Sequence, residues 1–253
     1  MEQVHRDVIR IPTSTLIKVK DGSATDESFE EQRQKLKQII NITLQEGNGK
    51  FYYYQGFHDI ATIFLHVLNS PNTDQDKQIP TVNDISIASS VLHSISQSHL
   101  NQYMEKDFNA LLNTMTFTII PMVHMLDPIL YNHLYKCNIF TNDIPFFALS
   151  WIITWFGHDL NDDVDLVKRL FDVMISSHPI FIIYLVVSML LHPYNRNLIL
   201  NGGVSDDEDG DDCFALMHNL LCTLPIQSYS CANNGDITNV PIQELIDNAI
   251  QFM

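Results

Sequence analysis

Two short segments carry polar side chains whose types and spacing could do chemistry. Val4–Arg10 has the pattern aliphatic-x-x-Asp-x-x-Arg, and Tyr53–Gly56 places Gln55 directly before a glycine. A guanidinium is planar, permanently charged and multidentate, so Arg10 is suited to binding oxyanions such as phosphate. The amide of Gln55 offers both donors and an acceptor, so it could orient a water molecule beside such a group.

Each pattern alone also has a purely structural explanation. Asp7 and Arg10 could form an i,i+3 ion pair on a helix, which contributes only about 0.2–0.5 kcal/mol. A Gln-Gly pair before an apolar stripe is often no more than a helix entry. The combination is more informative, because two further blocks follow in order, Phe147–His158 and Arg169–Asp172.

Together the four blocks resemble the TBC domain of Rab GTPase-activating proteins. The first two match its IxxDxxR and YxQG motifs, Phe147–His158 is similar to its FxLRW segment, and Arg169–Asp172 stands where the family has an RLWD-like helix start. The runs around YYYQG, HDI and WFGH are most similar to the endoplasmic-reticulum-anchored branch of the family. The resemblance covers roughly residues 3–192.

The resemblance implies a GTPase-activating protein for a Rab-family small GTPase in its GTP form, acting in vesicle-mediated and intracellular protein transport. In this family an arginine finger and a glutamine finger enter the partner's nucleotide site, and Arg10 and Gln55 occupy those positions. GTP and magnesium then belong to the partner. We therefore expect no cofactor and no metal site in the chain itself, and no independent catalytic activity.

Two other interpretations stay open. The chain could be a TBC-like module that binds a GTPase or another protein without accelerating hydrolysis. It could also be an unrelated helical interaction protein in which the motifs are coincidental. The motifs do not show which Rab is recognised, because that specificity depends on surface details outside them.

The neighbours expected to support the two fingers are Asp7, Tyr53, Gly56 and Asp59. Asp7 lies one helical turn from Arg10 and could orient it, and the resemblance places Tyr53 beside the arginine. Gly56 puts Gln55 on a tight entry turn, from which it can face outward while Phe57 faces inward. Asp59 falls in the first turn of the helix that follows, where its charge favours the helix dipole on its own account.

Three further positions differ in what they imply. His58 replaces an asparagine common in the family, and its role is open. Ser150 replaces an arginine that often precedes the tryptophan, which removes one candidate ion pair. Trp151 and Asp172 are expected to belong to the scaffold.

The elements that must position these residues have helical periodicity. Apolar residues recur at helical spacing behind Glu31, after Gly56 and before Ser96, in three sets: Leu36, Ile39, Ile40 and Leu44; Phe57, Ile60, Ala61, Phe64, Leu65 and Leu68; Ile85, Ala88, Val91, Leu92 and Ile95. Such stripes predict amphipathic helices. Four later segments are more uniformly apolar and predict helices in the centre of a helical domain: Ile119–Tyr135, Pro145–Phe156, Val164–Ile175 and Pro179–Leu191. The fold is predicted to be all-α, with a multi-helix TBC-domain architecture.

Composition excludes several classes of function. The chain of 253 residues has 14 Lys and Arg against 30 Asp and Glu, a formal charge of −16, which disfavours nucleic acid as a partner. The four cysteines have no metal-binding or redox spacing, so we expect reduced thiols. The longest apolar run, Pro179–Leu191, is shorter than the roughly 20 residues that span a bilayer. No direct membrane span is expected in this chain.

We expect one helical domain over residues 1–253, lacking the N-terminal helices with which the family's domain begins. Residues 201–212, which include SDDEDGDD, are predicted to form an acidic surface loop rather than an EF-hand, because the ligand positions do not fit. The resemblance implies a cytoplasmic protein. It also implies a location at the cytosolic face of the endoplasmic reticulum or Golgi, through a segment missing here.

Overall fold

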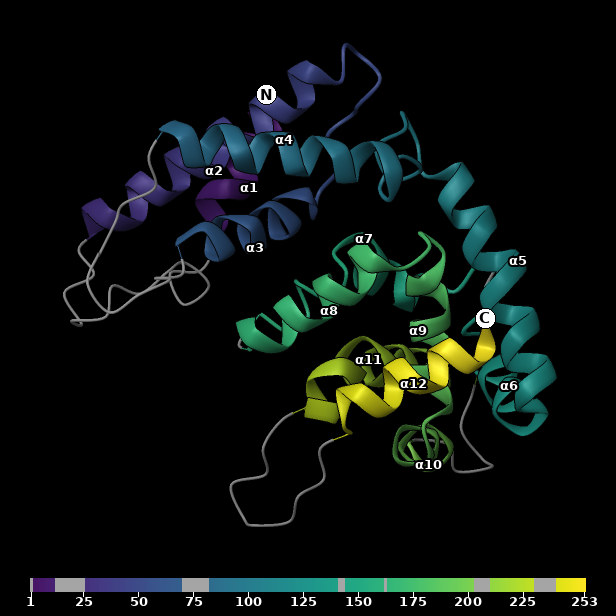
Figure 1. Cartoon of the computed structure of the whole chain (residues 1–253). Helices are drawn as coiled ribbons and strands as arrows, with labels where there is room; N and C mark the ends of the chain where they lie inside the picture. The colour runs from purple at the N-terminus through teal and green to yellow at the C-terminus, as the bar shows by residue number, and fades with distance from the viewer. Residues whose placement is uncertain are drawn as a thin grey trace. The chain divides into compact units, whose positions relative to one another are not determined.

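The computed structural model describes residues 2–11, 26–69, 82–140, 144–161, 163–202, 210–229 and 240–253. Every regular element within these ranges is a helix, which confirms the all-α prediction (Figure 1). The chain divides into two compact units, residues 1–108 with 153–175 and residues 109–152 with 176–253. The expectation of one domain over the whole chain stays a prediction.

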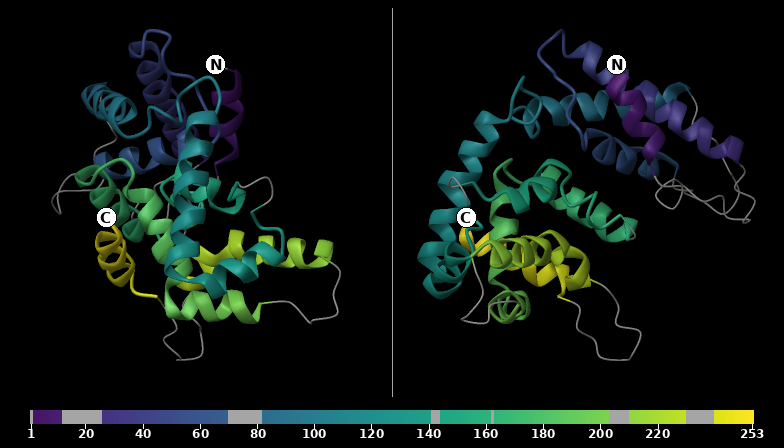
Figure 2. Two further views of the ribbon diagram at one scale, coloured as in Figure 1. Left: turned by 90° about the vertical axis from the view of Figure 1, so that its right-hand side faces the viewer. Right: turned by 180° about the vertical axis from the view of Figure 1, so that it is seen from behind.

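The first unit is built from helices near the N-terminus and one later helix. They are α1 (Glu2–Arg10), α2 (Asp26–Glu46), α3 (Phe57–Asn69), α4 (Val82–Ser98) and α8 (Val164–Ser176). Helices α2, α3 and α4 pack against one another, and α1 packs on α2 and α3 (Figures 1 and 2). The predicted stripes form this core, since Leu36, Ile39 and Ile40 of α2 and Phe57, Ile60 and Ala61 of α3 are fully buried.

The predicted stripe of α4 is wrong at one position. Val91 is 41% exposed, whereas Ser89 is 1% exposed and faces the core. The Ser89 hydroxyl donates to the Ile85 carbonyl at 2.8 Å, and Thr43 of α2 donates to the Ser89 carbonyl at 3.4 Å. Two small hydroxyl side chains thus occupy the α2–α4 contact, because each can bond to a backbone carbonyl one turn earlier instead of to water.

The second unit holds the remaining described elements. They are α5 (Asn109–Leu126), α6 (Pro128–Lys136), the short 3₁₀ helix η2 (Phe146–Ala148), α7 (Leu149–Ile153), α9 (Phe181–Leu191), α10 (Pro193–Asn201), α11 (Gly210–Tyr229) and α12 (Ile242–Phe252). Only the last residue of α7, Ile153, belongs to the first unit.

Helix α9 forms the centre of the second unit, as its uniformly apolar sequence predicts. Nine of its eleven residues are buried. Helix α12 packs along it, and the Ser188 hydroxyl donates to the Leu245 carbonyl of α12 at 2.8 Å. A neutral polar cluster adjoins this contact, in which Ser228 of α11 donates to Asn195 Oδ1 at 2.8 Å, and Asn195 donates to the Met189 carbonyl.

The apolar run Ile119–Tyr135 does not form the single buried helix that its composition predicts. It divides at Asp127 between α5 and α6. Pro128 stands at the first position of α6, where its missing N–H is no loss, and Asp127 caps the helix by accepting from the Leu130 N–H at 3.0 Å. Met125 and Ile129, on either side of the break, are 74% and 65% exposed. Asp127 is also paired with Arg196 of α10.

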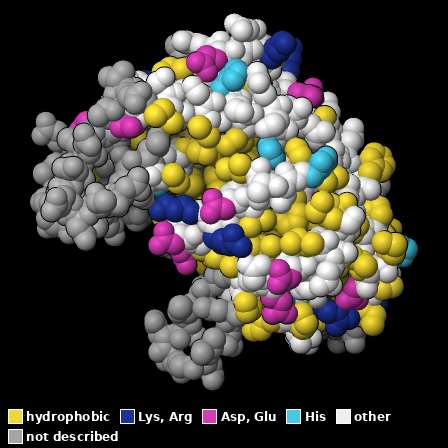
Figure 3. Space-filling view, in the orientation of Figure 1, with side chains coloured by type: hydrophobic (Ala, Val, Ile, Leu, Met, Phe, Trp, Pro, Cys, Tyr) yellow, Lys and Arg dark blue, Asp and Glu magenta, His cyan; other side chains and the backbone are white. Residues whose placement is uncertain are grey.

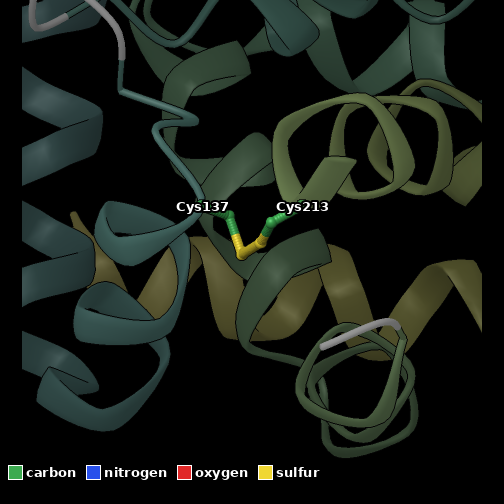
Figure 4. The surroundings of a disulfide bond; sticks show 2 residues. All are labelled: Cys137 and Cys213. Atoms are coloured by element: carbon green, nitrogen blue, oxygen red, sulfur yellow. A yellow bond between two sulfur atoms is a disulfide. The ribbon is translucent and has the colours of Figure 1, made fainter. Parts of the chain in front are cut away.

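The expectation of reduced thiols is wrong for one pair of cysteines. Cys137, at the end of α6, and Cys213, near the start of α11, form a disulfide across 76 positions of sequence (Figure 4). The spacing of cysteines along a chain carries no information about such a pair, because only the tertiary fold brings the two residues together.

The surface of the protein bears on two further predictions, the absence of a membrane span and the acidic loop. Apolar and charged side chains are interspersed on the face shown in Figure 3. Within the described ranges, no helix combines the length and the apolar character that a membrane crossing requires. The predicted acidic loop 201–212 is shorter than expected, because Asn201 ends α10 and Gly210 begins α11. Its remainder, residues 203–209, lies outside the described residues.

Candidate functional site

Helix α1 carries Arg10 at its last position. Val4, Val8 and Ile11 are buried along one face, at the spacing of a helical stripe. Arg10 is exposed on the opposite side of the helix end. The following residue is anchored, since the Arg33 guanidinium of α2 donates to the Ile11 carbonyl at 3.1 Å. Arg10 therefore projects from a fixed point, and among the described residues it forms no ion pair.

A tight turn before α3 presents Gln55. The side chains of Tyr54 and Phe57 are buried, whereas Gln55 between them is exposed. The Tyr54 hydroxyl donates to the Ile153 carbonyl at 2.9 Å and so fastens the turn to the core. The arrangement has Gln55 facing outward and Phe57 facing inward, as the sequence predicts.

Gly56 is required by the geometry of this turn. Its φ of 110° lies in the region that side chains disfavour, and a Cβ here would lie 2.9 Å from Thr154 Cγ2. The backbone can therefore approach Thr154 closely, and Gln55 is held immediately outside that contact. The Asp59 N–H donates to the Gly56 carbonyl at 3.0 Å, which closes the first turn of α3.

Asp7 joins these two segments to each other. Its side chain is only 6% exposed, and its carboxylate accepts a hydrogen bond from the Tyr53 hydroxyl at 2.9 Å. Asp7 was expected to orient Arg10, but no ion pair forms between these two residues in the described structure. The partner of Asp7 is Tyr53. Asp7 instead fixes α1, and with it the origin of the Arg10 side chain, against the chain two residues before Gln55.

Tyr53 also contacts the beginning of α3. Its hydroxyl oxygen lies 3.1 Å from His58 Nδ1, and its ring packs edge-on against Phe57. Burial, followed by the negative charge of Asp7, raises the pKa of Tyr53 above its ordinary value. The hydroxyl therefore keeps its proton at physiological pH and remains able to donate it.

Asp59 lies between two histidines. Its Oδ1 is 3.6 Å from His58 Nε2, and its Oδ2 is 3.5 Å from His158 Nδ1. The bond to Asp59 raises the pKa of His158, while partial burial acts in the opposite direction. Asp59 thus does more than favour the dipole of α3. It connects the helix start to the turn that follows α7.

His158 was not selected as a site residue from the sequence, although it ends the third motif block. Its position depends on a turn in which Trp155 and Phe156 both have positive φ, 51° and 63°, and both rings are buried. The His158 N–H bonds to Thr154 Oγ1 at 3.3 Å, so the residue beside Gly56 also holds the histidine. The linear spacing gives no signal for this contact. Trp151 is fully buried, in agreement with a scaffold role.

No group of three or more potential metal ligands gathers in the part of the chain that the structure describes. The site therefore consists of an exposed guanidinium, an exposed amide and a chain of polar contacts that connects the elements bearing them. That chain, which we call the site cluster, comprises Asp7, Tyr53, His58, Asp59 and His158.

The sequence model of the Rab-GTPase-TBC domain matches residues 1–200. The chain belongs to this family. The matched residues include α1, the Gln55 turn and all four motif blocks.

Individual relatives agree with this assignment. The chain is 31% identical to TBC1 domain family member 20 of Homo sapiens over 199 residues, which are 78% of this chain and 42% of that protein. It is 33% identical to GTPase-activating protein gyp10 of Schizosaccharomyces pombe over 199 residues, 76% of this chain and 44% of that protein. The chain therefore spans under half the length of these relatives.

Proposed function

We propose that this chain is a GTPase-activating protein for a Rab-family small GTPase, and that Arg10 and Gln55 act in the partner's nucleotide site. The observation that carries the proposal is the Tyr53–Asp7 hydrogen bond. It connects the helix bearing Arg10 to the segment bearing Gln55, while both of those side chains remain exposed. Family membership and a relative named as a GTPase-activating protein support the same activity.

Arg10 would supply the charge that the GTPase lacks. During hydrolysis negative charge develops on the phosphoryl oxygens, and an arginine supplied in trans to Ras-type GTPases accelerates the reaction by about 10³–10⁵. That factor corresponds to about 4–7 kcal/mol of transition-state stabilisation. A guanidinium without a carboxylate partner among the described residues is available for this task.

Gln55 would orient the attacking water. Its amide oxygen can accept a hydrogen bond from that water while its N–H groups donate toward the phosphate. Orientation of this kind is effective only when the side chain projects from a rigid segment. The contacts of Tyr54 and Gly56 provide that rigidity on both sides of Gln55.

The partner contributes the rest of the chemistry. GTP and magnesium arrive bound to the Rab, so the chain needs no cofactor of its own. The proposed cellular role is in vesicle-mediated and intracellular protein transport. We propose a cytosolic site of action at the endoplasmic reticulum or Golgi.

The test is single-turnover hydrolysis of GTP by a panel of purified Rab proteins, with and without the chain. We expect at least one Rab to respond, and Arg10→Ala and Gln55→Ala each to abolish most of the stimulation. Arg10→Lys should fail as well, because an ammonium cannot reproduce the planar bidentate contact.

Matched controls exist on the same and neighbouring helices. Arg6 is an exposed arginine of α1 paired only weakly with Glu2, and Gln45 is an exposed glutamine of α2. Arg6→Ala and Gln45→Ala should keep the full stimulation. If Arg10→Ala and Gln55→Ala kept it too, the assignment of the two residues would be wrong. Binding of a GTP-loaded Rab without acceleration would instead identify a non-catalytic TBC module.

A further inference from the structure

The Tyr53 hydroxyl has one proton and two neighbours that could use it. Asp7 Oδ2 lies at 2.9 Å and His58 Nδ1 at 3.1 Å. Asp7 is a buried carboxylate and can only accept. When the hydroxyl donates to Asp7, the contact with His58 is a hydrogen bond only if Nδ1 carries a proton and donates to the tyrosine oxygen.

The other nitrogen of the same ring faces a second carboxylate. His58 Nε2 lies 3.6 Å from Asp59 Oδ1. With a proton on Nδ1, a neutral ring would present a lone pair from Nε2 to the negative charge of Asp59. A doubly protonated ring avoids this repulsion, because both nitrogens then donate and its positive charge faces Asp59.

When His58 loses one proton, the remaining proton can lie on either ring nitrogen. If the remaining proton stays on Nε2 beside Asp59, Nδ1 becomes an acceptor and competes with Asp7 for the Tyr53 proton. Asp7 then loses the hydrogen bond from Tyr53 while remaining buried, with an exposure of only 6%. A buried carboxylate without that bond is costly, so the attachment of α1 to the Gln55 segment weakens.

We propose that His58 is a positioning residue whose doubly protonated ring holds Tyr53 on Asp7, so that stimulation of GTP hydrolysis falls as pH rises and this ring loses a proton. The proposal rests on the proposed function and adds its regulation. The polar contacts of His58 are with Tyr53 and Asp59 rather than with either finger. It acts through Tyr53 on the geometry between the elements that carry Arg10 and Gln55.

Among the described residues, the titratable groups in contact with this ring or with its partner Asp59 come from four segments. Asp7 comes from α1, Tyr53 from the segment before α3, Asp59 from α3 itself and His158 from the turn after α7. His158 shares the Asp59 carboxylate and adds a second positive charge when protonated, while Asp159 adds a negative charge beside His158. Histidine is the side chain that ordinarily changes charge between pH 5 and 8, which sets the pH range of the experiment.

His58→Asn separates this device from a merely structural histidine. An asparagine amide can place an N–H near the position of Nδ1 and donate to Tyr53, but it does not titrate. We expect His58→Asn to keep most of the stimulation at pH 6 and to make it nearly independent of pH. The ratio of wild-type to variant rate, measured with the same Rab, should fall by about threefold or more from pH 6 to pH 8. The pH dependence of the Rab itself cancels in this ratio.

Two further variants complete the experiment. His58→Leu removes the donor without supplying a competing acceptor. It should lower the rate at saturating protein at pH 6 and make the rate, relative to the Rab alone, nearly independent of pH. The concentration that gives half of that rate should change little, because the variant disturbs geometry rather than binding. In a Tyr53→Phe background the hydrogen bond to Asp7 is already absent, so His58→Asn should have no further effect.

The outcomes are distinguishable. A His58→Asn variant with the same pH dependence as the wild type, or a His58→Leu variant with full activity, would overturn the proposal while leaving Arg10 and Gln55 in place. If the wild type stimulated no Rab at any pH, the proposed function would fail instead. In that case the contacts within the site cluster would be tested by NMR of the imidazole nitrogens. If Tyr53→Phe alters the titration of His58, the proposed link between the two residues is supported, and if it does not, the proposal is overturned.

Discussion

The site cluster of the first unit and the Ser228 cluster of the second unit both bury polar side chains, but of different kinds. The Ser228 cluster, made of Met189, Asn195 and Ser228, contains only neutral groups, each with a partner of fixed donor or acceptor role. The site cluster contains two carboxylates, a phenol and two imidazoles, and the direction of its hydrogen bonds depends on the protons present. A neutral cluster fixes one structure, whereas an ionisable one can respond to the solution.

The largest effect is expected from the covalent link of the second unit. Replacing both Cys137 and Cys213 by serine should destabilise the protein by about 4 kcal/mol, because the disulfide closes a long loop and so limits the unfolded chain. Urea denaturation of the non-reduced protein measures the change. Cys222→Ser, which leaves the disulfide intact, is the control. Equal stability of the double variant and the wild type would show that the link is not formed in solution.

A matched pair of hydroxyl deletions tests the comparison directly. Tyr53→Phe and Ser228→Ala each remove one buried donor and should each cost about 1–3 kcal/mol near neutral pH. The cost of Ser228→Ala should not change between pH 6 and pH 8, since its partners do not titrate. Under the role proposed for His58, the cost of Tyr53→Phe should be larger at pH 6 than at pH 8. Tyr52→Phe, at an exposed neighbouring ring, serves as control. Identical pH profiles for the two deletions would remove the distinction.

In the second unit, the ion pair of Asp127 with Arg196 should respond at acid pH. The Arg196 guanidinium holds the pKa of Asp127 below its ordinary value. Stability from this pair is therefore present above the unfolded value, near pH 4, and is lost as pH falls through the folded value. Arg196→Ala should thus lose less stability than the wild type between pH 6 and pH 3. Arg6→Ala, at an exposed pair, should follow the wild type. Parallel curves for Arg196→Ala and the wild type would contradict the role of this pair.

The smallest effect is expected at His158. Because Asp59 raises its pKa, the stability it contributes is fully present below the unfolded value, near pH 6.5, and is lost as pH rises through the folded value. Its side chain is 62% exposed, so solvent screening keeps the contribution small. His158→Gln should flatten the fall in thermal stability from pH 6 to pH 9 slightly. The exposed His178→Gln should not. A fall as steep in His158→Gln as in the wild type would show that the Asp59 contact adds nothing.

Local features of this structure follow from the sequence. The helical stripes of α2 and α3 were predicted because the period of a helix is fixed by its backbone, and Gly47 and Gly56 mark their ends. The outward position of Gln55 was likewise visible in local spacing. Whether Arg10 and Gln55 act on a partner stays a prediction.

Features that depend on tertiary contacts were not predicted. Tyr53 is separated from Asp7 by 46 positions, and the two cysteines of the disulfide by 76. No periodicity connects residues so far apart. Ser89 faces the core in place of Val91, and its contact with Thr43 of α2 becomes visible only in the packed structure. The helix break at Asp127 required weighing one proline against a long apolar run.

The left-handed pair Trp155 and Phe156 has a consequence for the order in which the protein folds. Large side chains adopt positive φ at an energetic cost, and here the burial of both rings compensates for it. The turn is therefore not expected to be stable before the surrounding core has formed. His158, which depends on that turn, and the packing of Thr154 on Gly56 should arise in the same cooperative step as the core. Hydrogen exchange of the backbone amides around Gly56 and Gly157 should then require global rather than local unfolding. The exposed side chain of Gln55 would therefore belong to one of the backbone segments of the first unit that exchange most slowly.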